Sequence, residues 1–333
     1  MKRKRLSVCV CTYNGAKYLR EQLQSIKHQS QIPDEVIIAD DGSTDRTLDL
    51  INEFASEVTF AVKIIRSDGD PLGVTKNFER ALNVVTGEII VLSDQDDIWH
   101  VDRLRQIIRV FVKYPKVAYL FSNASIIDHQ GKPHIDSLWD RIGFGGKRAA
   151  EFQHGNQLSA LLCGDNFTYG MSMAIQHKIL DKILPINSQS VFFTHDVWIA
   201  VVLSALGHHG FAVQECLVSY RQHTDQIAGA GHRKVNQLRS VYNSLKAPRY
   251  FDCELPLALN EAALRVKQLA PSTLGNNSAV ELILGKAEHL RRREAASKIN
   301  FSRRLLLISK ELFTGRYNKF SNSIGTALRD LIG

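Results

Sequence analysis

Short apolar segments alternate with amphipathic segments over the first 125 residues, and this alternation constrains the fold more than any other feature. Period-2 and buried apolar runs predict strands at 6–12, 36–39, 58–66, 88–93 and 117–122. Helical spacing of apolar residues predicts helices at 16–29, 48–54, 77–85 and 101–114, with Ser43 or Thr44 able to cap the second one. The pattern is typical of an α/β protein in which helices connect the strands of a parallel sheet.

The rest of the chain is less regular. Periodicity fades over 123–164, where an irregular stretch with short strands or loops is expected. A helix at 197–206 and a strand at 211–218 return to the sheet, and the sequence beyond about 235 reads as amphipathic helix.

Composition excludes several classes of protein. With 44% hydrophobic and 23% charged residues, the 333-residue chain is an ordinary globular protein rather than a disordered or collagenous one. It contains no apolar run of the roughly 18 residues that a spanning helix needs, and its basic start leads into a strand rather than a signal sequence. Five cysteines, with Cys9 and Cys11 alternating in one strand, are expected to be reduced and structural. We therefore expect a cytoplasmic protein.

The positive charge is concentrated near the C-terminus. The whole chain carries 42 basic and 34 acidic residues, a net charge of +8, whereas residues 286–330 alone carry 11 basic and 4 acidic residues, or +7. The cations alternate with leucine and phenylalanine. One interpretation is an amphipathic helix on an anionic membrane, where an enzyme would meet lipid-linked acceptors. The other is a solvated helix that packs on the core. Nucleic acid is not expected, because few aromatic residues are there to stack on bases.

Polar residues follow three of the expected strands, where the strands end. They form the segments 12–15 (Thr-Tyr-Asn-Gly), 40–43 (Asp-Asp-Gly-Ser) and 94–97 (Asp-Gln-Asp-Asp). Any one of these alone would be explained by a turn or a helix cap. Ligands of open α/β sheets bind at the carboxyl ends of the strands, so the three segments together predict a single site.

The third segment is suited to a divalent cation. Asp94 and Asp96 are one residue apart, so on an extended chain their carboxylates point to the same side, about 7 Å apart, while Asp97 points away. One or two carboxylates beside substrate phosphates are the usual way in which proteins hold Mg²⁺, which implies a phosphorylated substrate. The alternative is that Asp96 or Asp97 caps the helix that begins near Val101.

These motifs resemble the family 2 inverting glycosyltransferases of GT-A fold, especially the bacterial rhamnosyltransferase-like members. The resemblance rests on SVCVCTYNGAKYL, EVIIADDGSTDRT, GEIIVLSDQDDIW and HDVW and extends over about residues 6–229. It implies a GT-A catalytic domain at 1–232, with a nucleotide-binding half (1–125) and an acceptor half (126–232), followed by a helical basic region at 233–333. It also implies a donor site formed by Thr12, Tyr13, Asn14, Asp40, Asp41 and Ser43, with Asp41 near the base.

The resemblance assigns further roles. Asp94 would lie near the ribose and Asp96 on a cation, Mg²⁺ or Mn²⁺. The loop and helix start at 73–78 (GVTKNF) resemble the segment that lines the donor site, so Lys76 and Asn77 are candidate contacts, although the usual Arg-Asn pair is absent.

Two later motifs supply the remaining candidates. Inversion by single displacement needs a base across the sugar ring from the leaving group, and Asp196 in FTHDVW resembles the family's base. Its alternative role is to cap the helix that starts at Val197. In YRQH, His223 would complete the shell of the cation and Arg221 would meet the diphosphate.

The resulting hypothesis is a metal-dependent transferase. It would move a sugar from a UDP- or dTDP-sugar, with dTDP-rhamnose as one candidate, to a glycan or lipid-linked acceptor in surface polysaccharide synthesis. It would act in the cytoplasm, with peripheral attachment to the inner membrane as a further expectation.

Two other functions remain open at this point. One is a sugar-nucleotide nucleotidyltransferase, although TYNGAKYL is a poor version of the glycine-rich loop that such an enzyme needs. The other is a non-catalytic protein that binds membrane or RNA through its basic end. A dinucleotide dehydrogenase is disfavoured, because no G-x-G-x-x-G follows the first strand.

Overall fold

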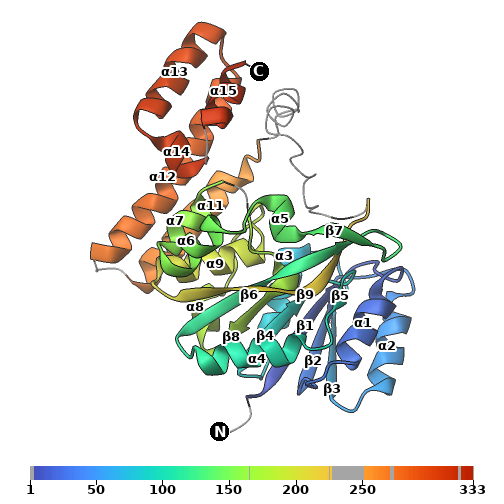
Figure 1. Cartoon of the computed structure of the whole chain (residues 1–333). Coiled ribbons are helices and arrows are strands. Elements are labelled where there is room, and N and C mark those ends of the chain that lie inside the picture. The colour runs from blue at the N-terminus through green and yellow to red at the C-terminus, as the bar shows by residue number, and fades with distance from the viewer. Residues whose placement is uncertain are drawn as a thin grey trace.

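The computed structural model of the chain describes residues 4–164, 166–224, 226, 251–270, 274–321 and 324–332. Its centre is one mixed sheet, around which the helices of the first 221 residues are arranged (Figure 1). The sheet order is β3 (Ala61–Arg66), β2 (Glu35–Asp40), β1 (Leu6–Thr12), β4 (Ile89–Ser93), β8 (Met173–Gln176), β6 (Val117–Ile127), β9 (His209–Arg221) and β5 (Ile98–Trp99), with β7 (Pro133–Ser137) paired to β6.

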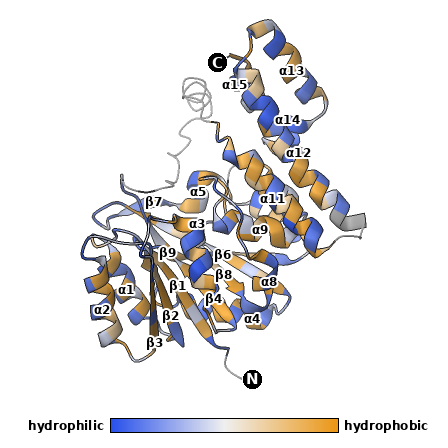
Figure 2. Ribbon diagram, turned by 180° about the vertical axis from the view of Figure 1, so that it is seen from behind, coloured by the Kyte–Doolittle hydropathy of each residue, from blue (hydrophilic) through white to orange (hydrophobic). Residues whose placement is uncertain are grey.

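The α/β prediction is confirmed, with a sheet that is mostly parallel. Strand β1 pairs in parallel with β2 and β4, and all seven of its residues are buried. Helices cover both faces of such a strand, which explains its almost wholly apolar sequence. The strands β8, β5 and β7 run antiparallel to their neighbours. The apolar character of β1 and β4 is visible in Figure 2.

The helices of the first 125 residues follow the expected order. They are α1 (Leu19–Lys27), α2 (Thr47–Glu57), α3 (Val74–Leu82) and α4 (Arg103–Lys113). Amphipathic spacing places Leu19, Leu23 and Ile26 of α1 in the core. Helix α3 packs on β1 and β2, so its first turn lies near the carboxyl ends of both strands.

Two expectations about local structure were wrong. The N-cap of α2 is Arg46, and the Ser43 hydroxyl donates to Asp40 instead of capping the helix. Residues 123–164 are more regular than expected, since β6 continues to Ile127 and three short helices follow β7. These helices are α5 (Leu138–Ile142), α6 (Lys147–His154) and α7 (Gln157–Leu162).

The part of the chain that follows α7 contributes β8, α8 (Leu180–Ile183), α9 (His195–Ala205) and β9. The expected helix and strand correspond to α9 and β9, whereas the four-residue strand β8 was not foreseen. Helix α9 is buried on nearly all sides, so its sequence shows little amphipathic pattern.

The C-terminal region is helical, as expected. It consists of α11 (Glu254–Leu269), α12 (Leu274–Ser297), α13 (Phe301–Phe313), α14 (Arg316–Phe320) and α15 (Ile324–Ile332). Helices α11 and α12 pack on α9, and α13 to α15 lie at the far end of α12 (Figure 1). The expected boundary at 232/233 lies outside the described residues. Among the helices that the structure describes, none combines the length and apolarity needed to cross a bilayer.

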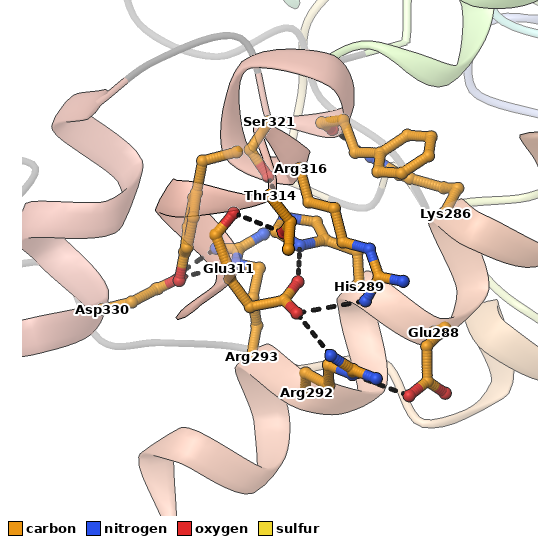
Figure 3. A network of polar contacts seen from close by, with 12 residues as sticks. Lys286, Glu288, His289, Arg292, Arg293, Glu311, Thr314, Arg316, Ser321 and Asp330 are labelled. Atoms are coloured by element: carbon orange, nitrogen blue, oxygen red, sulfur yellow. Dashed lines mark hydrogen bonds and ion pairs between the residues drawn. The ribbon is translucent and has the colours of Figure 1, made fainter. Parts of the chain in front are cut away.

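A polar network fixes the C-terminal helices to one another (Figure 3). The buried Glu311 of α13 accepts from Arg292 (2.8 Å) and Arg316 (3.1 Å) and contacts Nδ1 of His289 at 2.9 Å. Asp330 of α15 pairs with Arg293 at 2.6 Å and accepts from the Tyr317 hydroxyl at 2.9 Å. Several of the cations counted in the sequence are therefore used inside this region.

We expect mild acid to loosen this network. Burial lowers the pKa of His289, so below about pH 6.5 the unfolded chain binds a proton that the folded chain refuses. Stability of α12 to α15 should then fall as the pH drops from 7 to 5. Hydrogen exchange of residues 286–332 measures it, and His289→Gln should flatten this dependence.

The matched control is His134→Gln, which removes an exposed histidine on β7. Equal pH dependence in wild type and His289→Gln would show that His289 does not couple protonation to folding of these helices. Hydrogen bonds to Glu311 lower its pKa against the effect of its burial, so a second loss is expected only at more acidic pH.

Candidate active site

The ends of β1 and β2 are joined by a buried carboxylate. Asp40 accepts hydrogen bonds from the hydroxyls of Thr12 (2.8 Å) and Ser43 (2.5 Å) and from the Ser43 backbone N–H (2.9 Å). The Ser43 hydroxyl in turn accepts from the backbone N–H of Asn14 at 2.9 Å. Asp40 is fully buried, so these residues form a rigid floor between the two strand ends.

Asp41 holds the loop that precedes α3. Its carboxylate accepts from the backbone N–H groups of Leu72 (3.0 Å) and Gly73 (2.8 Å), and only 3% of the residue is exposed. Gly73 has φ of +84°, a conformation that other residues rarely adopt. The side chain expected near the donor base is thus engaged by this loop.

Lys76 and Asn77 lie at the same edge and bind protein groups. Asn77 donates to the Ala39 carbonyl at 2.7 Å, and Lys76 contacts Glu79 and the Ile186 carbonyl, each at 2.9 Å. Sequence reasoning missed Arg80, which donates to Asn77 Oδ1 at 3.1 Å and lies 4.0 Å from Asp41. Arg80 is three residues after Asn77 on the same helix, and this spacing could have predicted that the two side chains are neighbours.

The third strand end meets the first. The side-chain amide of Gln95, another residue that was missed, accepts from the Tyr13 N–H at 2.9 Å and donates to the Tyr13 carbonyl at 3.0 Å. The Tyr13 side chain itself is 45% exposed. The structure therefore brings the three polar segments together, as the topology predicted.

Carboxylates crowd the loop after β4. Burial raises the pKa of Asp94 to about 8, with further contributions from the nearby charges of Asp96 and Asp196. Asp97 is buried and accepts from the backbone N–H of Arg221 at 2.9 Å; burial and the charges of Asp96 and Asp94 raise its pKa. The N-cap of α4 is Asp102 rather than Asp96 or Asp97.

His223 and Arg221 reach this loop from the end of β9. Nε2 of His223 lies 2.8 Å from Oδ2 of Asp96, in line with the expectation that both face one cation. Arg221 is buried and donates to the Asp96 carbonyl at 2.8 Å and to the Glu21 carboxylate at 2.5 Å. Arg221 thus links the backbone of the acidic loop to Glu21 of α1.

Arg103 is a further buried cation behind the loop, also missed from the sequence. Its guanidinium donates to the Leu92 carbonyl at 3.2 Å and lies over the Trp99 ring, 4.1 Å from its centroid. Burial lowers the pKa of Arg103 to about 9, although the charges of Asp97 and Asp94 oppose that shift. Its charge partly offsets the repulsion among the carboxylates.

Asp196 lies in the first turn of α9. Its carboxylate accepts from the backbone N–H of Gly170 at 2.8 Å and from the Thr194 hydroxyl at 2.5 Å. The N-cap residue of α9 is Thr194, but the Asp196 carboxylate also accepts from the backbone N–H of Val197 at 2.8 Å, so it satisfies a donor of the first turn as its alternative role predicted. Its charge also contributes to the raised pKa of Asp94, after burial and the charge of Asp96.

His195 is packed beside this carboxylate. It is 4% exposed, and its ring stacks on Phe78 with 3.9 Å between ring centroids. Within the described part of the chain neither ring nitrogen has a hydrogen-bond partner, and burial lowers its pKa, which favours the neutral ring. Nε2 lies 2.5 Å from the position that a Cβ on Gly170 would take.

The donor set suits a hard divalent cation held partly by its ligand. His223 contacts Asp96, and the charge of Asp96 contributes to the raised pKa of Asp94, yet no three His, Cys, Asp or Glu side chains converge as a metal-binding group in the described residues. Mg²⁺ and Mn²⁺ commonly bind through one or two carboxylates and complete their shell with phosphate oxygens and water. The residues present fit that mode.

A mostly parallel sheet with a carboxylate cluster at the carboxyl ends of its strands is the arrangement of a GT-A type glycosyltransferase. The chain belongs to the family described as Glycosyl transferase family 2, whose profile matches residues 7–184, just over half of the sequence. This membership sets aside the nucleotidyltransferase and the non-catalytic alternatives.

Relatives agree with the assignment. A dTDP-rhamnosyl transferase of Shigella flexneri, RfbG, is 27% identical over 307 residues, which are 90% of this chain and 99% of that protein. An uncharacterized glycosyltransferase of Nostoc is 28% identical over 66% of this chain and 65% of its own length. The crystal structure of S. aureus TarS residues 1–349 with UDP-GlcNAc superposes with a TM-score of 0.60 at 14% identity, covering 92% of this chain and 79% of that one.

Gly170→Ala tests the packing beside Asp196. The added Cβ would meet a ring that Phe78 holds in place, so either the imidazole or the Gly170 backbone must shift. We expect a loss of about 1–3 kcal/mol in the free energy of unfolding, measured by chemical denaturation. Gly145→Ala is the control, because a Cβ there meets nothing within 4 Å.

Combining Gly170→Ala with His195→Ala should remove the clash. The double variant is therefore expected to be no less stable than His195→Ala alone. Simple addition of the two single effects would show that Gly170 and His195 do not constrain each other.

Proposed function

We propose that this glycosyltransferase moves a sugar, with inversion, from a UDP- or dTDP-sugar to a glycan or lipid-linked acceptor in a metal-dependent reaction. The observation that supports it most directly is the acidic loop at the end of β4, where His223 lies 2.8 Å from Asp96 and where burial and the charges of Asp96 and Asp196 raise the pKa of Asp94. Asp94, Asp96 and His223 suit a diphosphate with its cation, and Asp196 suits a hydroxyl group that must lose a proton.

Asp94 and Asp96, with His223, would hold Mg²⁺ or Mn²⁺. When bound, the cation neutralises charge that develops on the departing diphosphate. The residues of β1 and β2 would receive the nucleoside, on the floor formed by Thr12, Asp40 and Ser43. Tyr13 is the most exposed of these side chains and is available to stack on a base.

Asp196 would act as the general base. The N–H of Gly170 and the hydroxyl of Thr194 hold its carboxylate in place. It would accept the proton of the acceptor hydroxyl as that oxygen attacks the anomeric carbon from the side opposite the diphosphate. His195, the preceding residue, is buried and stacks on Phe78.

A dTDP-sugar, with dTDP-rhamnose as the first candidate, is favoured by the dTDP-rhamnosyl transferase relative, which matches 90% of this chain. A cytoplasmic site of action is consistent with the cysteines, because all five are free thiols. Bacterial surface polysaccharide synthesis is the process that we propose for the product.

Replacing the base should separate binding from chemistry. Asp196→Asn is expected to leave binding of UDP or dTDP within about twofold while sugar transfer falls at least about 100-fold, the usual contribution of a general base. Calorimetry and a coupled assay of released nucleotide measure the two quantities. Asp49→Asn, on the exposed side of α2, is the control, and an Asp196→Asn enzyme of normal activity would assign the base elsewhere.

Replacing the acidic loop should affect the donor and the metal together. Asp96→Asn is expected to abolish the Mn²⁺-dependent gain in affinity for UDP or dTDP, because it removes a carboxylate that faces His223. The measurement is titration calorimetry with Mn²⁺ and with EDTA. Wild-type protein that binds neither nucleotide in the presence of Mn²⁺ would contradict the proposed function.

A further inference from the structure

The helices at the end of the chain form a unit of their own, here called the C-terminal unit, comprising residues 286–321 and 324–332. It has a small separate core made of Ala296, Ile308, Tyr317 and Ala327. The network around Glu311 and Asp330 holds its helices together (Figure 3). The outer surface of α13 is therefore presented on a fixed scaffold.

Charge within the C-terminal unit is strongly unbalanced. All four of its acidic residues, Glu288, Glu294, Glu311 and Asp330, are paired with cations of the same unit. Eleven cations oppose these four acids, so +7 is left without internal compensation. Arg303 and Lys310 of α13 are exposed, and neither contacts an acid in the ranges that the structure describes.

An apolar face lies beside these two cations. Its members on α13, with their exposed fractions, are Phe301 (60%), Leu305 (43%), Leu306 (74%), Leu312 (37%) and Phe313 (97%). At 3.6 residues per turn they fall within an arc of about 140°. Arg303 and Lys310 follow at the Leu306 edge of that arc, and the buried Glu311 is on the opposite side of the helix.

Two aromatic rings and three leucines on one side, bordered by cations, are the pattern of a helix that lies in a membrane interface. Helix α13 is at the end of the molecule farthest from the sheet, and hydrophobic and hydrophilic residues alternate along it (Figure 2).

We infer that the face formed by Phe301, Leu305, Leu306, Leu312 and Phe313 docks on an anionic phospholipid bilayer, with Arg303 and Lys310 at the headgroups. A bilayer accommodates the apolar side chains and supplies the negative charge that the unit lacks. A second copy of this chain fits less well, because it would bring a like charge of +7 toward the same face. The inference goes beyond sugar transfer and does not depend on which donor is used.

Vesicle co-sedimentation of the full chain tests the apolar face. Wild-type protein should bind vesicles of phosphatidylcholine with 30% phosphatidylglycerol, and Leu306→Ser/Phe313→Ser should bind at least about tenfold more weakly. The control, Val112→Ser/Ile135→Ser, removes exposed apolar side chains of α4 and β7 and should bind like the wild type. A loss of the same size in the control would overturn the inference.

The cations are tested on the same vesicles. Arg303→Gln/Lys310→Gln should weaken binding at least about fivefold, and the matched change Lys63→Gln/Arg109→Gln, also at exposed positions, should have much less effect. Equal losses in the two variants would mean that net charge alone drives binding and would overturn the assigned face.

Oligomeric state tests the alternative that a second copy of this chain, rather than a bilayer, covers the face. Light scattering should show that wild type and Leu306→Ser/Phe313→Ser have the same mass. A wild-type dimer that the variant converts to monomer, with no vesicle binding, would assign the face to a second copy. Titration with UDP or dTDP in each variant checks the fold and the proposed function separately, since the donor site lies on the catalytic domain.

Discussion

Repulsion among carboxylates is the constraint around which the catalytic end of the sheet is arranged. Asp94, Asp96, Asp97 and Asp196 lie close enough for their charges to influence one another, and burial makes each charge more costly. The protein offsets this only in part, with the buried Arg103 and with Arg221 behind the loop. The raised pKa of Asp94 reflects the part that is not offset, and a divalent cation bound beside it would favour the charged form. The same imbalance that destabilises the free protein thus prepares it for its ligand.

The sequence was most informative where burial is complete. The strand at 6–12 was predicted with its correct bounds. Both faces of β1 are covered, so nearly every residue of the strand is apolar and the run is easily recognised in the sequence. The four residues of β8 are too few to show a period, and α5 to α7 are too short to show a face, so neither was foreseen. The convergence of three strand ends followed from topology alone, and the hydrogen bonds between Tyr13 and Gln95 confirm it.

Individual roles were harder to predict than the location of the site. Ser43 was a plausible cap for α2, but the nearby Asp40 provides a stronger acceptor for its hydroxyl. Asn77 and Lys76 bind carbonyl groups of the protein, which no motif could indicate without knowledge of which backbone lies opposite. For the same reason the internal ion pairs of the C-terminal region, in which Arg292, Arg293 and Arg316 bind Glu311 and Asp330, could not be predicted, although they leave its net charge unchanged.

The hydrogen bonds of Asp41 link base recognition to the order of a loop. Its carboxylate is already satisfied by the amides of Leu72 and Gly73. A pyrimidine ring that took the same oxygens as acceptors would have to share them or release these amides to water. Nucleoside affinity would then include the free energy of rearranging residues 67–73, and substitutions in that loop, which need not touch the donor, could alter how tightly a nucleotide is held.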